Sequence, residues 1–592
     1  MTKRDAGFLS AAVLLGVILR VLFLHDISGH LLYEVVTGDP AVYLDRARGI
    51  LDGIAVPSHA FFHSCPFYPF FLALVERVFG AGLAPVRIVQ ALIGIASIPL
   101  IFVLGRLSVG RTAGLVAAFL AAAYAPFLFF EAELLEITIV IAAVEGCLIM
   151  LLTAQRSGRA SHVVAAAVLL GIASLGKPNL LLFAPFGSLW VHAVMRRPVK
   201  RDGPRRSDRG RRALGYRPAA LLAVLFFIVA GAVVLPATIH NWRASGDLIP
   251  ISSNGGINLY IGNHEGAQGV FSVPPDMRFD LRVASKRAAE RAEGRTLSDG
   301  AVSDFWARQA FRFIRTHPGA FLGLTARKLV LFWNHFEIPN HYDMNFVSEF
   351  APVLRFSPSR FALIAPLGLL GLALAWSDRR RVGLLILFGT VFMVSVVPFF
   401  ITARYRLAVV PPLLVGAGFS LTWLWRTARA RAWRTLVPIL AALVLLGAAV
   451  NIRTIEFGAA PMHNTLGALL GSRGDMEGAA REFAAAVGIS PTDLSARYNL
   501  GLSLLELGRP EEAAEHLERA VEIHPGYHEA SLALARAHHE LGRPAAAADA
   551  ARRVLTADPP APPELAAVAQ AALRMIAETR EAGAGESGSN SH

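Results

Sequence analysis

Charged residues are scarce in this chain of 592 residues, of which only 17% are Asp, Glu, Lys or Arg. A soluble globular protein has about 25%. Hydrophobic residues make up 54%, and apolar runs recur from Gly7 to Val450 at close to the roughly 20 residues that a membrane-spanning helix needs. The scarcity of charge therefore excludes an ordinary soluble protein and predicts a polytopic membrane protein with a soluble tail.

Cysteine is also scarce. Cys65 and Cys147 lie far apart and match no metal or disulfide spacing. No small-residue cleavage site follows the first apolar run, which Arg20 interrupts, so we interpret that run as an uncleaved anchor. The net charge of +13 comes from basic residues in short loops, as the positive-inside rule expects. We therefore expect no nucleic-acid partner.

The apolar runs predict an all-α bundle of about eleven spans, with the N-terminus cytoplasmic because of Lys3 and Arg4. Loop 196–217 holds ten Lys/Arg against two Asp and is the strongest cytoplasmic marker. Residues 65–80 are apolar, but counting them as a span would move every later basic loop outward, so we interpret them as an interfacial helix. The expected spans are 7–25, 84–106, 113–130, 134–154, 162–176, 178–195, 218–239, 360–376, 382–401, 407–425 and 435–451, giving a membrane domain 1–451 with outer loops 26–82 and 240–357.

The tail contains an internal repeat. Pro491, Pro525 and Pro559 are 34 residues apart, and Gly474 and Gly508 keep the same period. This period and these residue types predict an α-solenoid of tetratricopeptide repeats over 461–577. The solenoid either binds a protein or peptide, or serves as a self-association or stabilising element. Residues 578–592 read as a disordered tail.

Acidic residues lie close to the predicted outer surface. In DPAVYLDRARGILDG, Asp39 followed by Pro40 is typical of a helix start, so capping alone could account for it. Glu131, Glu133 and Glu136 stand at the outer end of the fourth span. Carboxylates beside hydrocarbon usually mark a pathway or a site, although Glu136 could also act on the dipole of its helix.

Six motifs over about 1–425 resemble the GT-C class of membrane glycosyltransferases, near the protein O-mannosyltransferase and aminoarabinose transferase branch. They are GDPAVYLDRA, HSCPFYPFFLALVERVFG, ELLEITIVI, GIASLGKPNLLLFAP, the block 236–269 with SNGGINLYIGN, and ARYRLAVVPPLL, in the family's order. The resemblance implies transfer of a sugar from a polyprenyl phosphate to an outer-face acceptor.

The implied chemistry assigns roles to the acids. A carboxylate can act as base towards an acceptor hydroxyl, and a single displacement inverts the anomeric centre. We expect Asp39 to be the base and Glu136 to orient the acceptor or the sugar, with Glu131 and Glu133 as further substrate contacts.

The leaving phosphate needs cations. Arg404 and Arg406, with Tyr405 between them, follow the ninth span, and guanidinium suits phosphate. Lys177 in the GKPN turn and His63 are additional candidates. Snorkelling of the arginines at the interface is the alternative.

The block SNGGINLYIGN reads as a loop near the sugar, or simply as loop architecture. It supplies four candidate substrate contacts: Asn254, Asn258, Tyr260 and Asn263. It is not a nucleotide-binding glycine pattern.

No cofactor follows from the sequence. A D-x-D motif is absent, no metal ligands are assigned, and use of a divalent cation stays open. The expected partners are a polyprenyl-phosphate sugar donor, membrane lipid, and an acceptor protein or glycan that the repeats could bind. The short loops suggest a bacterial inner membrane, with the repeats extracytoplasmic. Two alternatives remain: a non-catalytic scaffold with repeats, and a ligase or polymerase of lipid-linked glycans.

Overall fold

The computed structural model describes residues 2–53, 59–62, 66–196, 215–272, 281–339, 341–454, 458–557 and 561–589. These residues form helices with only isolated bridges between extended segments, so the predicted all-helical class is confirmed for them. The chain divides into two compact units. One comprises residues 1–28 and 36–455, and the other residues 29–35 and 456–592.

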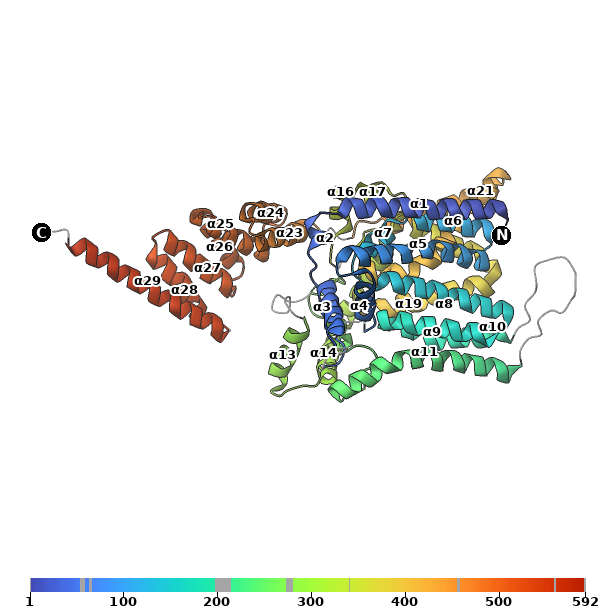
Figure 1. Ribbon diagram of the computed structural model, residues 1–592, viewed down its shortest axis with the longest axis horizontal. Helices are drawn as coiled ribbons and strands as arrows, with labels where there is room; N and C mark the ends of the chain where they lie inside the picture. Colours follow the sequence, from blue (N-terminus) through green and yellow to red (C-terminus); the bar gives the residue numbers. More distant parts are fainter. Residues whose placement is uncertain are drawn as a thin grey trace, which may run out of the picture. The chain divides into compact units, whose positions relative to one another are not determined.

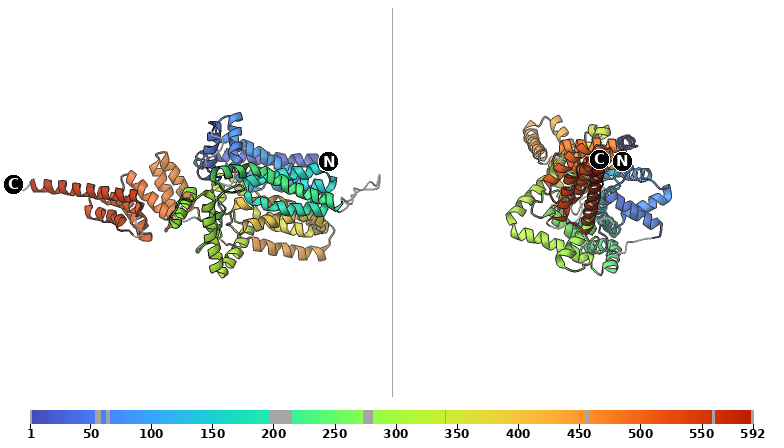
Figure 2. Two further views of the ribbon diagram at one scale, coloured as in Figure 1. Left: turned by 90° about the horizontal axis from the view of Figure 1, so that it is seen from below. Right: turned by 90° about the vertical axis from the view of Figure 1, so that its left-hand side faces the viewer.

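Among the described residues of the first unit, eight helical stretches are long and apolar enough to cross a membrane, so the chain is a multi-pass integral membrane protein. They are α1 (Lys3–Ile27), α5 (Leu83–Ser108), α8 (Ile137–Ser157), η1 with α10 (Pro178–Leu182, Phe183–Met195), α11 (Tyr216–Ser245), α18 with α19 (Phe361–Leu374, Arg379–Val396), α20 with α21 (Ala403–Arg406, Val410–Arg429) and α22 (Trp433–Val450). Figure 2 shows these helices running side by side.

The count of eleven spans stays a prediction. Two expected spans, 113–130 and 162–176, fall on the shorter helices α6 (Arg111–Ala122) and α9 (Ala160–Gly176). The segment expected to span over 113–130 is not one unbroken helix, because the chain leaves α6 at Ala123 and resumes as α7 (Ala125–Ala132). Pro126 in the first turn of α7 has no amide hydrogen to continue the α6 ladder, and the amide of Ala125 donates instead to the carbonyl of Ser359 at 3.0 Å.

Short helices gather at one end of the bundle, opposite the end where the chain begins (Figure 1). These are α3 (Asp39–Leu51), α4 (Tyr68–Phe79), α12 (Gly255–Gly262), α13 (Leu281–Glu293), α14 (Asp299–Thr316) and α15 (Pro318–Trp333). In Figure 1, α3 and α4 run across the direction of the long helices. The arrangement of α4 agrees with an interfacial helix rather than a span.

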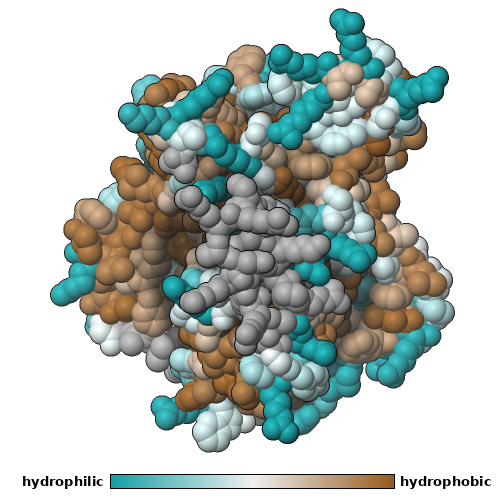
Figure 3. Space-filling view, turned by 90° about the vertical axis from the view of Figure 1, so that its right-hand side faces the viewer, coloured by the Kyte–Doolittle hydropathy of each residue, from teal (hydrophilic) through white to brown (hydrophobic). Residues whose placement is uncertain are grey.

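The opposite end of the bundle carries hydrophilic side chains around its rim (Figure 3). Exposed basic residues end or begin helices there, among them Arg4, Arg156, Arg379 and Arg426. The flanks show mainly apolar side chains in the same view, as a surface in contact with lipid requires.

Glycine allows a close helix contact between α18 and α21. A Cβ on Gly371 would collide with the carbonyl oxygen of Gly416, and one on Gly416 would collide with that of Gly368. Small residues let membrane helices approach backbone to backbone, where van der Waals packing stabilises them.

We therefore expect Gly371→Ala to lower the stability of the detergent-solubilised protein by about 1–3 kcal/mol, the usual cost of overpacking. Thermal unfolding followed by loss of monodisperse protein measures this. Gly383→Ala is the matched control, since a Cβ there meets nothing within 4 Å. Equal behaviour of the two variants would contradict the close packing.

The second unit is a solenoid of paired helices. Its elements are α23 (Ala460–Ser472), α24 (Met476–Ile489), α25 (Leu494–Glu506), α26 (Pro510–Ile523), α27 (His528–Glu540), α28 (Pro544–Leu555) and α29 (Pro563–Ser589). The repeated small residue lies where paired helices touch: a Cβ on Gly501 would press into Leu517. Helix α29 continues to Ser589, so it extends into the segment 578–592 that we predicted to be disordered.

A short helix from the other end of the chain completes this unit. Helix α2 (Leu31–Glu34) contacts α23, and Glu34 pairs with Arg473 at 2.9 Å. The solenoid therefore includes residues that precede the Asp39 turn in sequence.

Candidate functional site

Asp39 is the first residue of α3, and the helix cap is Gly38 with φ +66°. The alternative that Asp39 caps the helix is therefore wrong, because Gly38 occupies the cap position and the cap makes no side-chain hydrogen bond to the first turn. The Asp39 carboxylate instead faces Arg404, whose Nη1 and Nη2 both lie 3.1 Å from Oδ2. The Asp39 side chain is 33% exposed and that of Arg404 only 4%, so the acid is the accessible member of the pair.

Glu136 pairs with Lys177 inside the protein. The Lys177 Nζ lies 2.6 Å from Oε1 of Glu136, and both side chains are buried. Glu136 immediately precedes α8, and Lys177 lies in the turn between α9 and η1. Burying two charges is costly unless they are paired, so each residue determines the position of the other.

The ring of Tyr405 links the two ion pairs. The Lys177 ammonium lies 4.8 Å and the Arg404 guanidinium 5.4 Å from its centroid, which is within the range of cation–π attraction. Glu136 also acts on Arg404 electrostatically. Two acids from separate turns, Asp39 and Glu136, therefore meet around Arg404, Tyr405 and Lys177.

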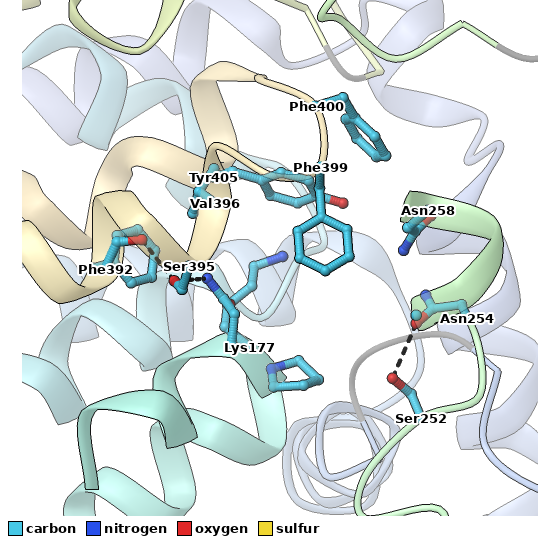
Figure 4. Close-up of a pocket in the computed structure, with 13 residues that line it drawn as sticks. Lys177, Ser252, Asn254, Asn258, Phe392, Ser395, Val396, Phe399, Phe400 and Tyr405 are labelled. Carbon is cyan, nitrogen blue, oxygen red and sulfur yellow. Dashed lines mark hydrogen bonds between the residues drawn. The ribbon is translucent and has the colours of Figure 1, made fainter. Parts of the chain in front are cut away.

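A cavity of about 180 Å³ lies beside Lys177 and Tyr405 (Figure 4). Asn254 and Asn258 face it from α12, across from Phe392 and Val396 of α19. Most of the exposed wall of the cavity is apolar. Seven of the thirteen lining residues carry polar groups. They are Lys177, Asn179, Ser252, Asn254, Ser395, Asn258 and the Tyr405 hydroxyl. Such a combination is typical of a site for a small amphipathic ligand.

Asn263 and Tyr260 do not line this cavity. The Asn263 amide donates to the carbonyls of Leu259 and Pro398 at 2.8 and 2.7 Å. Tyr260 packs against Trp306, with ring centroids 4.7 Å apart. Both side chains brace α12 and so act on the cavity only through its wall.

Arg406 lies apart from Arg404, although the two residues are separated by one position. Its guanidinium pairs with Glu337 at 2.8 Å, donates to the carbonyl of Phe336 at 2.9 Å and covers the ring of Phe361. The side chain is buried, and these contacts tie α20 to the loop after α15.

Glu131 and Glu133 also have partners of their own. Arg20 donates two hydrogen bonds of 2.6 Å to the Glu131 carboxylate. This ion pair accounts for the arginine in the first apolar run. Glu133 is buried near Tyr342, and burial followed by the charge of Glu133 raises the pKa of that phenol. Glu133 therefore borders the site, whereas Glu131 stabilises the bundle.

His63 lies outside the described residues. Within the described ranges, no group of three or more His, Cys, Asp or Glu side chains is arranged to hold a metal ion.

The sequence motifs did not point to Lys328, a buried residue of α15. Its Nζ donates to Oδ1 of Asn263 at 3.0 Å and approaches the carbonyl of Pro398 at 3.4 Å, next to the cavity residue Phe399. Burial lowers the pKa of this ammonium to about 8. In the sequence, Lys328 stands between Arg327 and the apolar run LVLFW, which gives no separate signal for it.

This shift gives a pH dependence. Between about pH 8 and the ordinary lysine value of about 10.4, the unfolded chain binds the proton that folded Lys328 has lost, so stability rises with pH across that window. We expect Lys328→Met to remove this increment. Unfolding temperatures of both proteins at pH 7 to 10.5 measure it, and parallel curves would contradict it.

Family comparisons agree with this architecture. Residues 59–204 match the family model described as dolichyl-phosphate-mannose-protein mannosyltransferase, and residues 498–562 match the tetratricopeptide repeat. The resemblance predicted from the motifs is thus confirmed over these two segments: the membrane domain contains a stretch similar to GT-C-type mannosyltransferases, and the tail contains tetratricopeptide repeats. A search of curated proteins gives no match.

Solved structures give weak overall similarity. The oligosaccharyltransferase of Archaeoglobus fulgidus is 15% identical with a TM-score of 0.42, covering 78% of this chain. This chain spans 55% of that enzyme's length. ArnT from Cupriavidus metallidurans, solved bound to undecaprenyl phosphate, is 16% identical with a TM-score of 0.40, covering 92% of this chain and 80% of its own.

Proposed function

We propose that this chain transfers a sugar from a polyprenyl-phosphate donor to an acceptor hydroxyl on the extracytoplasmic side of the membrane. One observation carries the proposal. The ion pairs Asp39–Arg404 and Glu136–Lys177 meet at the ring of Tyr405, beside an apolar-walled cavity. The mannosyltransferase family match over 59–204 supports the reaction class.

Asp39 is the candidate base because it is the accessible acid of the two pairs. As the acceptor oxygen bonds to the anomeric carbon, its proton passes to Asp39, and the bond from that carbon to the phosphate oxygen breaks. The electron pair leaves with polyprenyl phosphate. Attack from the opposite face inverts the anomeric centre.

Lys177 is the candidate phosphate contact, since it lines the cavity and its ammonium lies beside Tyr405. Phe392, Val396 and Phe399 offer apolar walls to the first units of the prenyl chain. Asn254 and Asn258 offer amides to sugar hydroxyls. We assign Arg404 to stabilising the growing negative charge while it holds Asp39.

The orientation follows from the end of the bundle at which the site lies. The short helices around Asp39 lie opposite the N-terminal end with its rim of basic side chains. By the positive-inside rule, the basic end is cytoplasmic and the site extracytoplasmic, as in a bacterial inner membrane. The repeats, which follow α22, then lie on the site's side and bind an acceptor protein or glycan.

Mass spectrometry of extracytoplasmic glycoproteins and glycolipids, with and without the gene, tests this function. We expect single-sugar mass increments to disappear on deletion and to return with the wild-type gene on a plasmid. Loss of whole glycan chains would indicate a ligase or polymerase instead. Unchanged glycans, together with lost protein complexes, would indicate a scaffold.

A further inference from the structure

The turn that carries Asp39 is held by a segment three hundred residues away in sequence. Oγ1 of Thr37 lies 3.1 Å from Nε2 of His341, and Tyr342 also hydrogen-bonds to Thr37. Thr37 and Gly38 immediately precede Asp39, so these contacts act on the backbone that positions its carboxylate.

The imidazole of His341 also occupies the space beside Gly38. A Cβ on Gly38 would lie 2.9 Å from Cε1 and 3.0 Å from Nδ1 of that ring. Gly38 has φ +66°, a conformation that other residues adopt only with strain. Glycine is therefore required twice at this position, by its backbone conformation and by the ring packed on it.

His341 is placed to support the Asp39–Arg404 pair without competing with it. Its ring lies in the electrostatic field of both side chains, and burial lowers its pKa to about 4. The ring is therefore neutral near pH 7. A neutral ring does not compete with Arg404, both of whose terminal nitrogens contact the Asp39 carboxylate.

We propose that His341 is a positioning residue for Asp39: its imidazole, hydrogen-bonded to Thr37 and packed on Gly38, fixes the turn that presents the carboxylate. This inference rests on the proposed function, because it assumes that Asp39 is the base. His341 itself touches neither the cavity nor the reacting groups, and its effect passes through the turn.

The test compares His341→Leu, which keeps the bulk but loses the hydrogen bond, with His341→Gln, whose side-chain amide can still reach Thr37. Full-length protein is reconstituted in vesicles with the host's own lipid extract as donor source, and release of polyprenyl phosphate is followed by mass spectrometry. We expect His341→Leu to lower kcat at least tenfold, with the apparent KM for the extract within twofold of wild type. His341→Gln should recover most of kcat.

Thr37→Val provides the second measurement. Valine keeps the shape of threonine and removes the hydroxyl that His341 contacts, so we expect a similar loss of kcat. Thr37→Val removes the contact with His341 and also the hydrogen bond to Tyr342, so the double variant with His341→Leu should lose little more than Thr37→Val alone. Unfolding temperatures within a few degrees of wild type show that the variants are folded.

A wild-type kcat in His341→Leu would overturn this proposal, as would fully additive losses in the double variant or no recovery in His341→Gln. If Asp39→Asn is inactive in the same assay while His341→Leu is fully active, the proposed function stands and the positioning role alone fails. If the wild-type protein releases no polyprenyl phosphate, both fail together.

Discussion

Asp39→Asn is expected to lower the rate of sugar transfer by about 10²–10⁴-fold, which is the usual contribution of a general base. Asparagine has the same shape, and its amide oxygen can still accept from Arg404, so the turn and the ion-pair geometry are retained in outline. It cannot take a proton from an acceptor hydroxyl. Initial rates of polyprenyl phosphate release in reconstituted vesicles measure the effect.

Asp45→Asn is the matched control for this experiment. Asp45 is exposed on the same helix, and the loss of its charge should leave the transfer rate within twofold of wild type. If Asp39 had only a structural role, Asp39→Asn would retain transfer activity, because the asparagine can still hydrogen-bond to Arg404. A rate within tenfold of wild type would end the assignment of Asp39 as base.

The arrangement around Arg404 shows which contacts of the site the sequence could predict. The sequence placed Asp39, Glu136, Lys177 and Arg404 in one candidate site, and in the structure Asp39 contacts Arg404 and Glu136 contacts Lys177. Each pair joins residues distant in sequence, and only the family resemblance related them.

The two arginines of TARYR show what local sequence does not reveal. Residues two apart on a helical turn face different directions, so Arg404 reaches Asp39 while Arg406 reaches Glu337. Both satisfy the same motif. The partner of Arg406 comes from the loop after α15, and no spacing in the sequence relates the two.

Two of the candidate acids, Glu131 and Glu136, likewise have different partners although they are close in sequence. Both belong to one short segment of the sequence, but Arg20 pairs with Glu131 and Lys177 with Glu136. An arginine within an apolar run needs a partner, so Arg20 was a sequence signal for a structural ion pair. His341 had no such signal, because its importance depends on the shape of the Gly38 turn.

The structural and catalytic roles of the Glu136–Lys177 pair can be distinguished by comparing single and double variants. Both side chains are buried and their charged atoms are 2.6 Å apart. Glu136→Gln leaves the Lys177 ammonium without its counterion, and Lys177→Met leaves the Glu136 carboxylate without one. Removing one partner of a buried pair typically costs about 3–5 kcal/mol, so both single variants should unfold at clearly lower temperatures than wild type.

The double variant Glu136→Gln with Lys177→Met carries no buried charge at this place, and replacing a buried pair by neutral groups is often close to neutral for stability. We therefore expect its unfolding temperature to return towards wild type. Its transfer rate should stay low, because Lys177 lines the cavity and a methionine cannot hold a phosphate. If the double variant regained both stability and transfer, the pair would only support the bundle, and the donor phosphate would have to bind elsewhere.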